Sequence, residues 1–335
     1  MDQLLRSEVG QPRDFSVAVA TEEVEVCDLC GGKVFAFERT SPDLVERLVA
    51  GEHAYVRCLR CRLCFLSPRP TAAEIGKVYP ADYEPYADGP PRRPSWWQRL
   101  AGRVGRRPSW LSRLLVAIPQ RQACHPIPAW NGGGRILDVG CGGGAFLDTM
   151  KQLGWETHGR DPSPQACDVV ARKGHRVRRG TAADIDDPPE SYDVVYLYHV
   201  LEHTFSPRET LARLHDVLKP GGRLVMAVPN YGGLQMRLFG RYSSALDPPR
   251  HLYQFERQTL RRYLYAAGFR DVEITTRTGA QSVTKALRLL LNDLLGTTFR
   301  REPAWLSAPF ELSTILCGLF GFFGAGRDLR VVARR

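Results

Sequence analysis

Short apolar runs alternate with amphipathic stretches along the chain after residue 131. The runs rich in aliphatic and β-branched residues are typical of buried strands, and they occupy residues 135–139, 156–159, 193–197 and 223–228. Between the runs, apolar residues recur at helical spacing, as at 164–173 and 208–218. Strands that alternate with helices predict a parallel sheet that is covered on both faces.

The end of the chain extends this pattern. Residues 257–267 have helical periodicity and are followed by Gly268, a residue that commonly ends helices. Residues 271–276 and 329–333 favour extended structure. We expect these two runs to pair with each other as the closing strands of the sheet.

Changes in composition divide the chain into four zones. Residues 1–20 are polar and are expected to form a flexible N-terminus. Residues 21–84 contain five of the nine cysteines, and residues 85–130 form a basic linker with helical patterning. Residues 131–335 carry the alternating strands and helices. A hydrophobic content of 43% excludes a mainly disordered chain.

The cysteine zone contains two pairs with two residues between the partners. The pairs are Cys27 with Cys30 and Cys58 with Cys61. Thiolates at this spacing close a tetrahedral zinc site, although redox dithiols or unliganded cysteines remain alternatives. The 27 residues between the pairs are more than usual, and we expect a helix at 43–50 to occupy them. Cys64 is expected to be a buried apolar residue, and His53 is a weaker substitute ligand.

A glycine-rich turn follows the run at 135–139. It reads ILDVGCGGG from Ile136, with a helix expected to begin at Ala145. Glycines allow the backbone to approach a ligand closely, and a helix N-terminus offers unpaired N–H groups. Asp161, 23 residues after Asp138, is placed to accept hydrogen bonds from both hydroxyls of a ribose. Ala145 replaces the third glycine of the dinucleotide fingerprint, and no phosphate-cradling P-loop sequence occurs.

Four segments in this order resemble class I S-adenosylmethionine-dependent methyltransferases. They are ILDVGCGGG, HGRDPSP, YDVVYLYHVLEHTFSP and LKPGGRLVMAVPN, and the resemblance covers about residues 131–335. It implies an α/β fold with a Rossmann-like, doubly wound, mostly parallel seven-stranded sheet, and S-adenosyl-L-methionine as cofactor. The cofactor-binding residues that it implies are Asp138, Gly140, Gly142, Gly144, Asp161, Pro162 and Asp184, with His199 on the same side of the sheet. Relatives often have an acid at the position of Thr181. The sequence leaves open whether Asp184 takes the place of that acid.

The expected reaction is an in-line displacement, for which the protein aligns the nucleophile with the methyl group and sulfur. A hydroxyl acceptor must also lose a proton, and histidine is suited to removing it. His251 and His203 are the candidate general bases, and a structural role is the alternative for each. His203 follows Glu202, which is placed to orient it. His199 is expected to serve as a packing residue.

The cysteine zone extends the resemblance. The segments CDLCGGKVF, YVRCLRCRLCFLSPRP and YPADY resemble the N-terminal zinc-ribbon module of methyltransferases linked to sugar and polysaccharide modification. PPRHLYQF, which contains His251, resembles substrate-side segments of relatives that act on sugars. This implies structural zinc on the two cysteine pairs and a sugar or sugar-derived hydroxyl, phosphorylated or lipid-linked, as acceptor. Tyr79, Tyr83 and Tyr86 either line the acceptor site or pack between domains.

Two other functions fit the same motifs. One is methylation of a small aromatic or quinone-type acceptor, and the other is a non-catalytic scaffold that binds the cofactor. All these readings imply a small-molecule ligand. We expect the acceptor to be anionic or to contain a sugar, and the arginines favour an anionic one.

Positive charge is concentrated in one stretch. The net charge is +10, and the residues from 89 to 137 contain nine arginines but no Asp, Glu or Lys. Residues 92–121 have the pattern of basic amphipathic helices, and residues 305–323 are strongly apolar. These stretches predict peripheral contact with a membrane, or alternatively pack together with the arginines in solvent or on substrate phosphates. No nucleic-acid-binding motif occurs, so nucleic acid is not an expected partner.

Hydropathy also indicates in which part of the cell the protein is expected. The charge-free run at 312–326 has 15 residues, fewer than the roughly 20 that span a bilayer. Charged residues are spread through the first 26 positions, so no signal-peptide core is recognisable. We expect a cytoplasmic protein, with the inner membrane surface as the alternative site.

Overall fold

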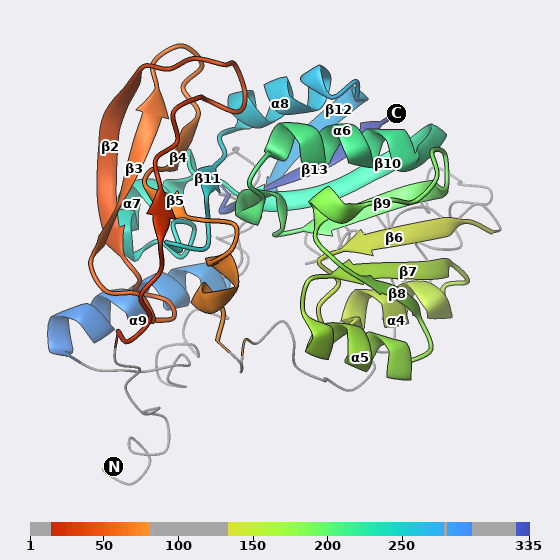
Figure 1. Cartoon of the computed structure of the whole chain (residues 1–335), viewed down its shortest axis with the longest axis horizontal. Coiled ribbons are helices and arrows are strands. Elements are labelled where there is room, and N and C mark those ends of the chain that lie inside the picture. Colours follow the sequence, from red (N-terminus) through yellow and green to blue (C-terminus); the bar gives the residue numbers. More distant parts are fainter. Residues whose placement is uncertain (1–14, 81–82, 84–132, 278–279, 297–325) are drawn as a thin grey trace, which may run out of the picture. The chain divides into compact units, whose positions relative to one another are not determined.

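The computed structural model describes residues 15–80, 83, 133–277, 280–296 and 326–335 (Figure 1). The chain forms two compact units, each described here by itself. Unit 1 comprises Met1–Pro80, Pro229–Leu260 and Thr275–Leu329, and unit 2 comprises Ala81–Val228, Arg261–Ile274 and Arg330–Arg335. The zone from 131 to 335 is therefore divided between the units, and its residues 229–260 group with the N-terminal cysteines.

A mostly parallel sheet forms the centre of unit 2. Its described strands have the order β12-β13-β10-β9-β6-β7-β8. Their bounds are β6 (Arg135–Val139), β7 (Glu156–Asp161), β8 (Arg176–Arg179), β9 (Tyr192–Tyr198), β10 (Leu218–Pro229), β12 (Arg270–Arg277) and β13 (Asp328–Arg334). Strand β6 pairs in parallel with β7 and β9, as do β7 with β8 and β9 with β10. The expected pairing of the two closing strands is also confirmed, because β12 and β13 are neighbours.

Two helices of unit 2, α5 (Pro164–Arg172) and α6 (Pro207–Val217), begin at serine caps followed by proline. The other described helices are α4 (Ala145–Gln152), η3 (Ala182–Asp184), η4 (Leu201–His203) and α8 (Arg257–Ala266), the last beginning in unit 1. The Ser163 hydroxyl accepts a hydrogen bond from the backbone of Ala166, and Ser206 caps α6 in the same way. A proline follows each serine at the first helical position, where its missing N–H costs nothing.

The hydrophobic core of unit 2 packs α4 against the central strands of the sheet. Ile136 on β6 and Val194 on β9 are buried together with Phe146 and Met150 of α4. The rings of Phe146 and Tyr196 are stacked, with centroids 3.8 Å apart. Because β6, β7 and β9 are parallel, their carboxyl ends lie at one edge of the sheet, where ligands of such folds bind.

Unit 1 combines N-terminal strands with a strand from the later part of the chain. Its four-stranded sheet has the order β11-β4-β3-β2, and the short strands β1 and β5 pair separately. The bounds are β1 (Thr21–Glu22), β2 (Phe35–Pro42), β3 (Glu52–Cys58), β4 (Cys64–Leu66), β5 (Arg69–Pro70), η1 (Ile75–Val78), α7 (Leu234–Phe239), η5 (Gly240–Tyr242), β11 (Tyr253–Gln254) and α9 (Ala280–Leu295). Tyr253 and Gln254 pair antiparallel with Phe65 and Cys64. This pairing explains why residues 229–260 belong to the cysteine-containing unit.

The predicted helix at 43–50 is wrong. Strands β2 and β3 pair antiparallel, and the segment between them forms turns. The fully buried carboxylate of Asp43 accepts hydrogen bonds from the backbone of Glu46, Leu48 and Val49. An aspartate that captures nearby backbone N–H groups competes with the helical hydrogen bonds that those groups would otherwise make.

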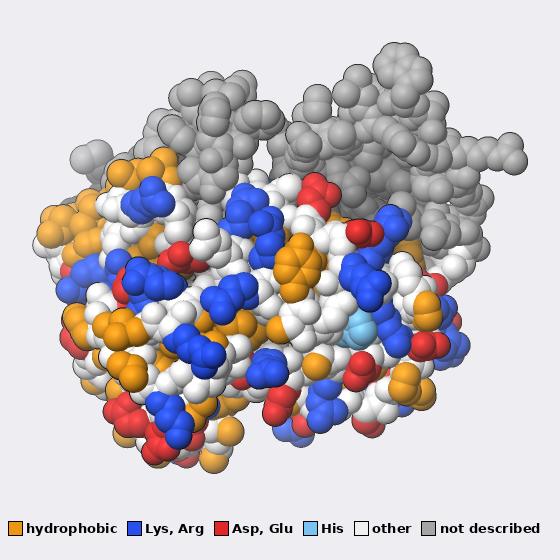
Figure 2. Space-filling view, turned by 90° about the horizontal axis from the view of Figure 1, so that it is seen from above, with side chains coloured by type: hydrophobic (Ala, Val, Ile, Leu, Met, Phe, Trp, Pro, Cys, Tyr) orange, Lys and Arg blue, Asp and Glu red, His pale blue; other side chains and the backbone are white. Residues whose placement is uncertain are grey.

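The arginine-rich linker at 85–130 lies outside the described residues, as do Tyr86, residues 92–121 and residues 305–323. Within the described part, no helix is both long and apolar enough to cross a bilayer. On the face seen in Figure 2, Lys and Arg side chains are interspersed with acidic and hydrophobic ones. The membrane expectation and the other predicted roles of the linker therefore stay predictions.

Candidate functional site

The glycine-rich loop after β6 has a backbone shape that only glycine adopts readily. Gly140, Gly142 and Gly144 have φ angles of 72°, 50° and 77°. A Cβ atom on Gly140 would collide with the side chain of Val200. Gly144 is the N-cap of α4, so the loop leads directly into a helix N-terminus. The expected strand–loop–helix arrangement is therefore present.

Asp161 at the end of β7 is fastened to this loop. Its Oδ2 accepts a hydrogen bond from the Gly142 N–H, and its Oδ1 accepts one from the Ser163 N–H, both at 2.9 Å. Burial raises the pKa of Asp161, while the two hydrogen bonds oppose this effect. A carboxylate has about four acceptor positions, so Asp161 retains capacity for the two hydroxyls of a ribose.

Asp138, on β6, forms a pair of buried acids with Asp161. Burial, reinforced by the charge of Asp161, raises the pKa of Asp138 well above its usual range. Asp138 is therefore favoured as the protonated member of the pair. A protonated carboxyl is also a hydrogen-bond donor, which widens what it can offer a ligand.

Asp184 lies beside the position where relatives have an acid. Its Oδ2 accepts hydrogen bonds from the backbone N–H and the hydroxyl of Thr181, both at 2.7 Å. These hydrogen bonds lower the pKa of Asp184. The carboxylate of Asp184 is therefore held against Thr181, the residue that caps the start of η3. Pro162, the other residue expected near adenine, accepts a hydrogen bond from Arg179 at its carbonyl oxygen.

Arg160 is a residue that sequence reasoning missed. Its buried side chain pairs with Asp186 at 2.7 Å and Asp187 at 3.2 Å. It also donates a hydrogen bond to the carbonyl of Asp184. Arg160 thus ties the segment after η3 to β7. A charged residue inside an otherwise buried strand is the sequence signal that would have drawn attention to it.

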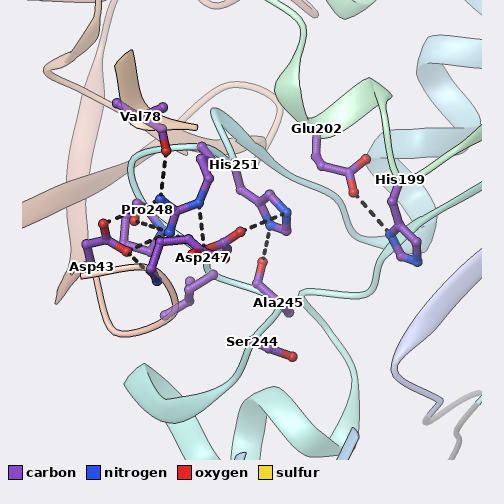
Figure 3. Close-up of polar contacts among 12 residues, drawn as sticks. Asp43, Val78, His199, Glu202, Ser244, Ala245, Asp247, Pro248 and His251 are labelled. Carbon is purple, nitrogen blue, oxygen red and sulfur yellow. Dashed lines mark hydrogen bonds and ion pairs between the residues drawn. The ribbon is translucent and has the colours of Figure 1, made fainter. Parts of the chain in front are cut away.

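The histidines of unit 2 lie just after β9. His199 Nδ1 is 3.1 Å from Oε1 of the fully buried Glu202, as Figure 3 shows. Glu202, the acid expected to orient His203, thus contacts His199, and one of its carboxylate oxygens also lies within 4.8 Å of a ring nitrogen of His203. His199 also has a positive φ of 54°, with its N–H donating to the carbonyl of Ala227. His203 is half-buried in η4.

His251, in unit 1, has a ring that is fixed in one orientation. Its Nδ1 is 2.7 Å from the carbonyl oxygen of Ala245 (Figure 3). Because a carbonyl only accepts hydrogen bonds, Nδ1 carries the proton and Nε2 is the basic nitrogen of the neutral ring. Asp247 Oδ2 lies 3.8 Å from Nε2. The basic nitrogen of the imidazole thus lies beside a carboxylate.

A buried arginine maintains the charge of that carboxylate. Arg250 has no exposed surface, and its Nη2 is 2.6 Å from both Asp247 Oδ1 and Asp43 Oδ1. Its Nη1 donates to the carbonyl of Val78 at 3.2 Å. Burial alone would raise the pKa of Asp247, but the charges of Arg250 and His251 outweigh it and lower that pKa. Asp247 is therefore ionised next to His251, where its negative charge would stabilise an imidazolium once the ring accepts a proton.

The four predicted zinc ligands come together in unit 1. The sulfur atoms of Cys27, Cys30, Cys58 and Cys61 all lie within 4.8 Å of one another. Two of the separations are 3.4 Å between Cys27 and Cys61 and 3.6 Å between Cys30 and Cys58. Zinc–sulfur bonds of about 2.3 Å in a tetrahedron place sulfurs roughly 3.8 Å apart. The donor set and its spacing therefore fit a zinc ion.

Cys64 and His53, which accompany the two cysteine pairs in the sequence, lie outside the cluster of four cysteines. Among the described residues, neither Cys64 nor His53 belongs to the cysteine cluster. Cys64 is buried on β4, and burial raises its pKa to about 12, as expected for an apolar thiol.

Tyr79 packs with a small apolar cluster that includes Val78, and Tyr83 is half-buried.

Comparisons with known proteins find similarity over one part of the chain. Residues 109–274 match the model of a family described as a methyltransferase domain. A ubiquinone biosynthesis O-methyltransferase of Bradyrhizobium sp. is 38% identical over 101 residues, which are 29% of this chain and 40% of that protein. The protein of the same description from Mesorhizobium japonicum is 32% identical over 154 residues, covering 43% of this chain and 62% of the relative. These matches thus span only part of the relatives' length.

Solved structures with a similar chain path include methyltransferases. One is a S-adenosylmethionine-dependent methyltransferase from Archaeoglobus fulgidus, with 23% identity and a TM-score of 0.44. That match covers 67% of this chain and 92% of the other.

Proposed function

We propose that this chain is a class I S-adenosylmethionine-dependent methyltransferase that transfers a methyl group from that cofactor to a hydroxyl of a small acceptor, which its match to a methyltransferase domain supports. One observation carries the proposal. The Asp161 carboxylate is bonded to the Gly142 N–H of a left-handed glycine loop, at the edge where parallel strands end. This arrangement offers acceptors for a ribose, and the N-terminus of α4 offers backbone N–H groups for an amino-acid moiety.

The acceptor class that we propose is a small aromatic or quinone-type molecule with a hydroxyl group. Sequence motifs alone placed a sugar hydroxyl first, whereas several relatives are described as ubiquinone biosynthesis O-methyltransferases. That description supports the aromatic alternative. A sugar hydroxyl is the second candidate, because the segment that resembles sugar-acting relatives belongs to the same unit as the cysteine cluster.

His251 is the general base in this proposal. When bound, S-adenosylmethionine supplies a methyl group activated by a positively charged sulfur. His251 Nε2 accepts the proton of the acceptor hydroxyl, and the ionised Asp247 stabilises the resulting imidazolium. Arg250 maintains the charge on Asp247 without reaching the acceptor itself. His203 is the second candidate base.

Zinc on the four cysteines has a structural role in this proposal. The ion would join the turn at Cys27 and Cys30 to the turn at Cys58 and Cys61. Four thiolates complete a tetrahedral site, so no coordination position is open for a reacting group. The zinc therefore organises unit 1 and takes no part in the methyl transfer.

The proposed function is tested by binding and turnover together. We expect calorimetry to detect S-adenosylhomocysteine binding, and the protein to methylate phenolic or quinone-type hydroxyls faster than those of nucleotide sugars. Faster methylation of the sugars would transfer the proposal to the second candidate. Binding without turnover on either panel would identify a non-catalytic scaffold, and no binding at all would overturn the proposal.

Replacing Asp161 with asparagine should weaken S-adenosylhomocysteine binding by about 10- to 100-fold in calorimetry. Hydrogen bonds to a charged group contribute about 1.5–3 kcal/mol, and an amide retains only one of the two acceptor oxygens. Asp168→Asn, at an exposed position on α5, is the matched control and should leave affinity unchanged. Wild-type affinity in Asp161→Asn would contradict the assignment of this carboxylate to the cofactor.

Protein purified without added metal should contain about one zinc ion per chain in elemental analysis. The variant Cys58→Ser should lose most of it, because a serine hydroxyl is a poor zinc ligand. Cys64→Ser changes a neighbouring cysteine outside the cluster and should keep the full zinc content. Metal-free native protein, with the four clustered thiols freely reactive, would exclude the zinc site.

A further inference from the structure

The middle of the glycine loop is held by a lysine that no motif indicates. Lys173 Nζ donates a hydrogen bond to the carbonyl oxygen of Gly143 at 2.7 Å. Lys173 is the C-cap residue of α5, 30 positions further along the chain. Its side chain is only 13% exposed, so the ammonium group is largely shielded from water. The contact therefore reaches the loop from a helix that follows the next strand.

The ammonium group of Lys173 is itself held in place. Asp148 Oδ2, on α4, lies 3.4 Å from Lys173 Nζ. The other oxygen of Asp148 is 2.9 Å from His175 Nε2, and His175 Nδ1 is 2.8 Å from the hydroxyl of Thr157 on β7. Asp148, His175 and Thr157 are all buried. Groups on α4, on β7 and in the segment after α5 thus determine where the ammonium group lies.

The loop needs external contacts to keep one shape. Gly142 and Gly144, on either side of Gly143, both have positive φ angles, and glycine backbones have more accessible conformations than any other. Two side chains anchor this stretch: Asp161 accepts from the Gly142 N–H, and Lys173 donates to the Gly143 carbonyl. A peptide carbonyl and the following N–H turn together, so fixing the Gly143 oxygen also fixes the Gly144 N–H.

We propose that Lys173 is a positioning residue for the cofactor, which holds the glycine loop in the conformation that receives the amino-acid part of S-adenosylmethionine. This inference rests on the proposed function. Lys173 acts through the loop backbone and need not touch the cofactor. Asp161 holds the loop through an N–H group, and Lys173 holds it through a carbonyl group.

A second lysine provides a matched control in the same pair of helices. Lys151 Nζ, on α4, donates to the carbonyl of Gly174 at 2.9 Å and to that of Lys173 at 3.5 Å. Both lysines thus connect α4 with the end of α5. The carbonyls that Lys151 contacts lie after α5, whereas Lys173 contacts the loop. A change at Lys151 removes a comparable link without the loop contact.

The test compares Lys173→Met with Lys151→Met, because methionine keeps most of the apolar stem and removes the charge. By calorimetry, Lys173→Met should bind S-adenosylhomocysteine about 10-fold more weakly, while Lys151→Met stays within about twofold of wild type. Lys173→Arg retains a cationic donor and should recover part of the affinity. Hydrogen exchange of the amides at 142–146 should accelerate in Lys173→Met only.

The outcomes separate this inference from the function on which it rests. Wild-type affinity in Lys173→Met, or an equal loss in Lys151→Met, would overturn the positioning role and leave the proposed methyltransferase function intact. Equal thermal destabilisation of the two variants with a loss of affinity in only one supports the positioning role, because a purely structural contribution would weaken binding in both. A wild-type protein that fails to bind S-adenosylhomocysteine would instead overturn the function itself.

Discussion

Replacing His251 with alanine should lower the rate constant for methyl transfer by about 10²- to 10⁴-fold, the range that loss of a general base produces. The imidazole is held by the Ala245 carbonyl with Nε2 as its basic nitrogen, and Asp247 lies 3.8 Å from that atom. The residues assigned to the cofactor belong to unit 2, whereas His251 belongs to unit 1. We therefore expect the affinity for S-adenosylhomocysteine to change little, so that the loss appears in kcat.

Two further variants make this prediction specific. His251→Gln keeps an amide that can donate to the Ala245 carbonyl but has no basic nitrogen, so it should be as slow as His251→Ala. His53→Gln changes another histidine of unit 1, on β3, and should retain the wild-type rate. A near-normal kcat in His251→Ala would remove His251 from the reaction and make His203→Ala the next variant to measure.

Replacing Arg250 with methionine should destabilise the protein by about 3–5 kcal/mol in denaturant unfolding. Arg250 is fully buried between Asp43 and Asp247, and removing its guanidinium leaves two carboxylates in the interior without their partner. The matched control is Arg69→Met in the same unit. Arg69 pairs at 2.9 Å with Glu22, whose side chain is 43% exposed, and such a pair contributes at most about 1 kcal/mol.

The loss of unfolding free energy in Arg250→Met should depend on pH. Without the guanidinium, burial raises the folded-state pKa of Asp247 above its unfolded value. The folded variant then binds more protons than the unfolded chain, and its stability falls as pH rises. The deficit should therefore be larger at pH 8 than at pH 5. A variant within 1 kcal/mol of wild type at both pH values would show that the buried arginine is not required for unit 1.

Local patterns predicted most of unit 2 from the sequence. The run at 135–139 became β6 with the same bounds, and α5 and α6 begin after serine caps that are followed by proline. Strand periodicity, caps and glycine turns act over a few residues, so the printed sequence contains the information needed to find them. The cysteine pairs were predictable for the same reason, since their spacing is itself a local signal.

Local patterns failed where a distant partner decides the structure. The segment at 43–50 has helical periodicity, but Asp43 instead bonds to its own turn and to Arg250, 207 positions away in the chain. The grouping of residues 229–260 with the N-terminal unit depends on β11 joining β4, and a two-residue strand is too short to be recognised by periodicity.

The sequence by itself determined the strand–loop–helix motif, its glycines, Asp161 and the four clustered cysteines, because each follows from residue type and short spacing. Only the tertiary structure decided that Lys173 holds the Gly143 carbonyl, that Glu202 contacts His199, and that Asp43 shares Arg250 with Asp247. These contacts join buried polar groups that must find partners in the folded chain. Which partner each one finds is determined by how the strands and helices pack.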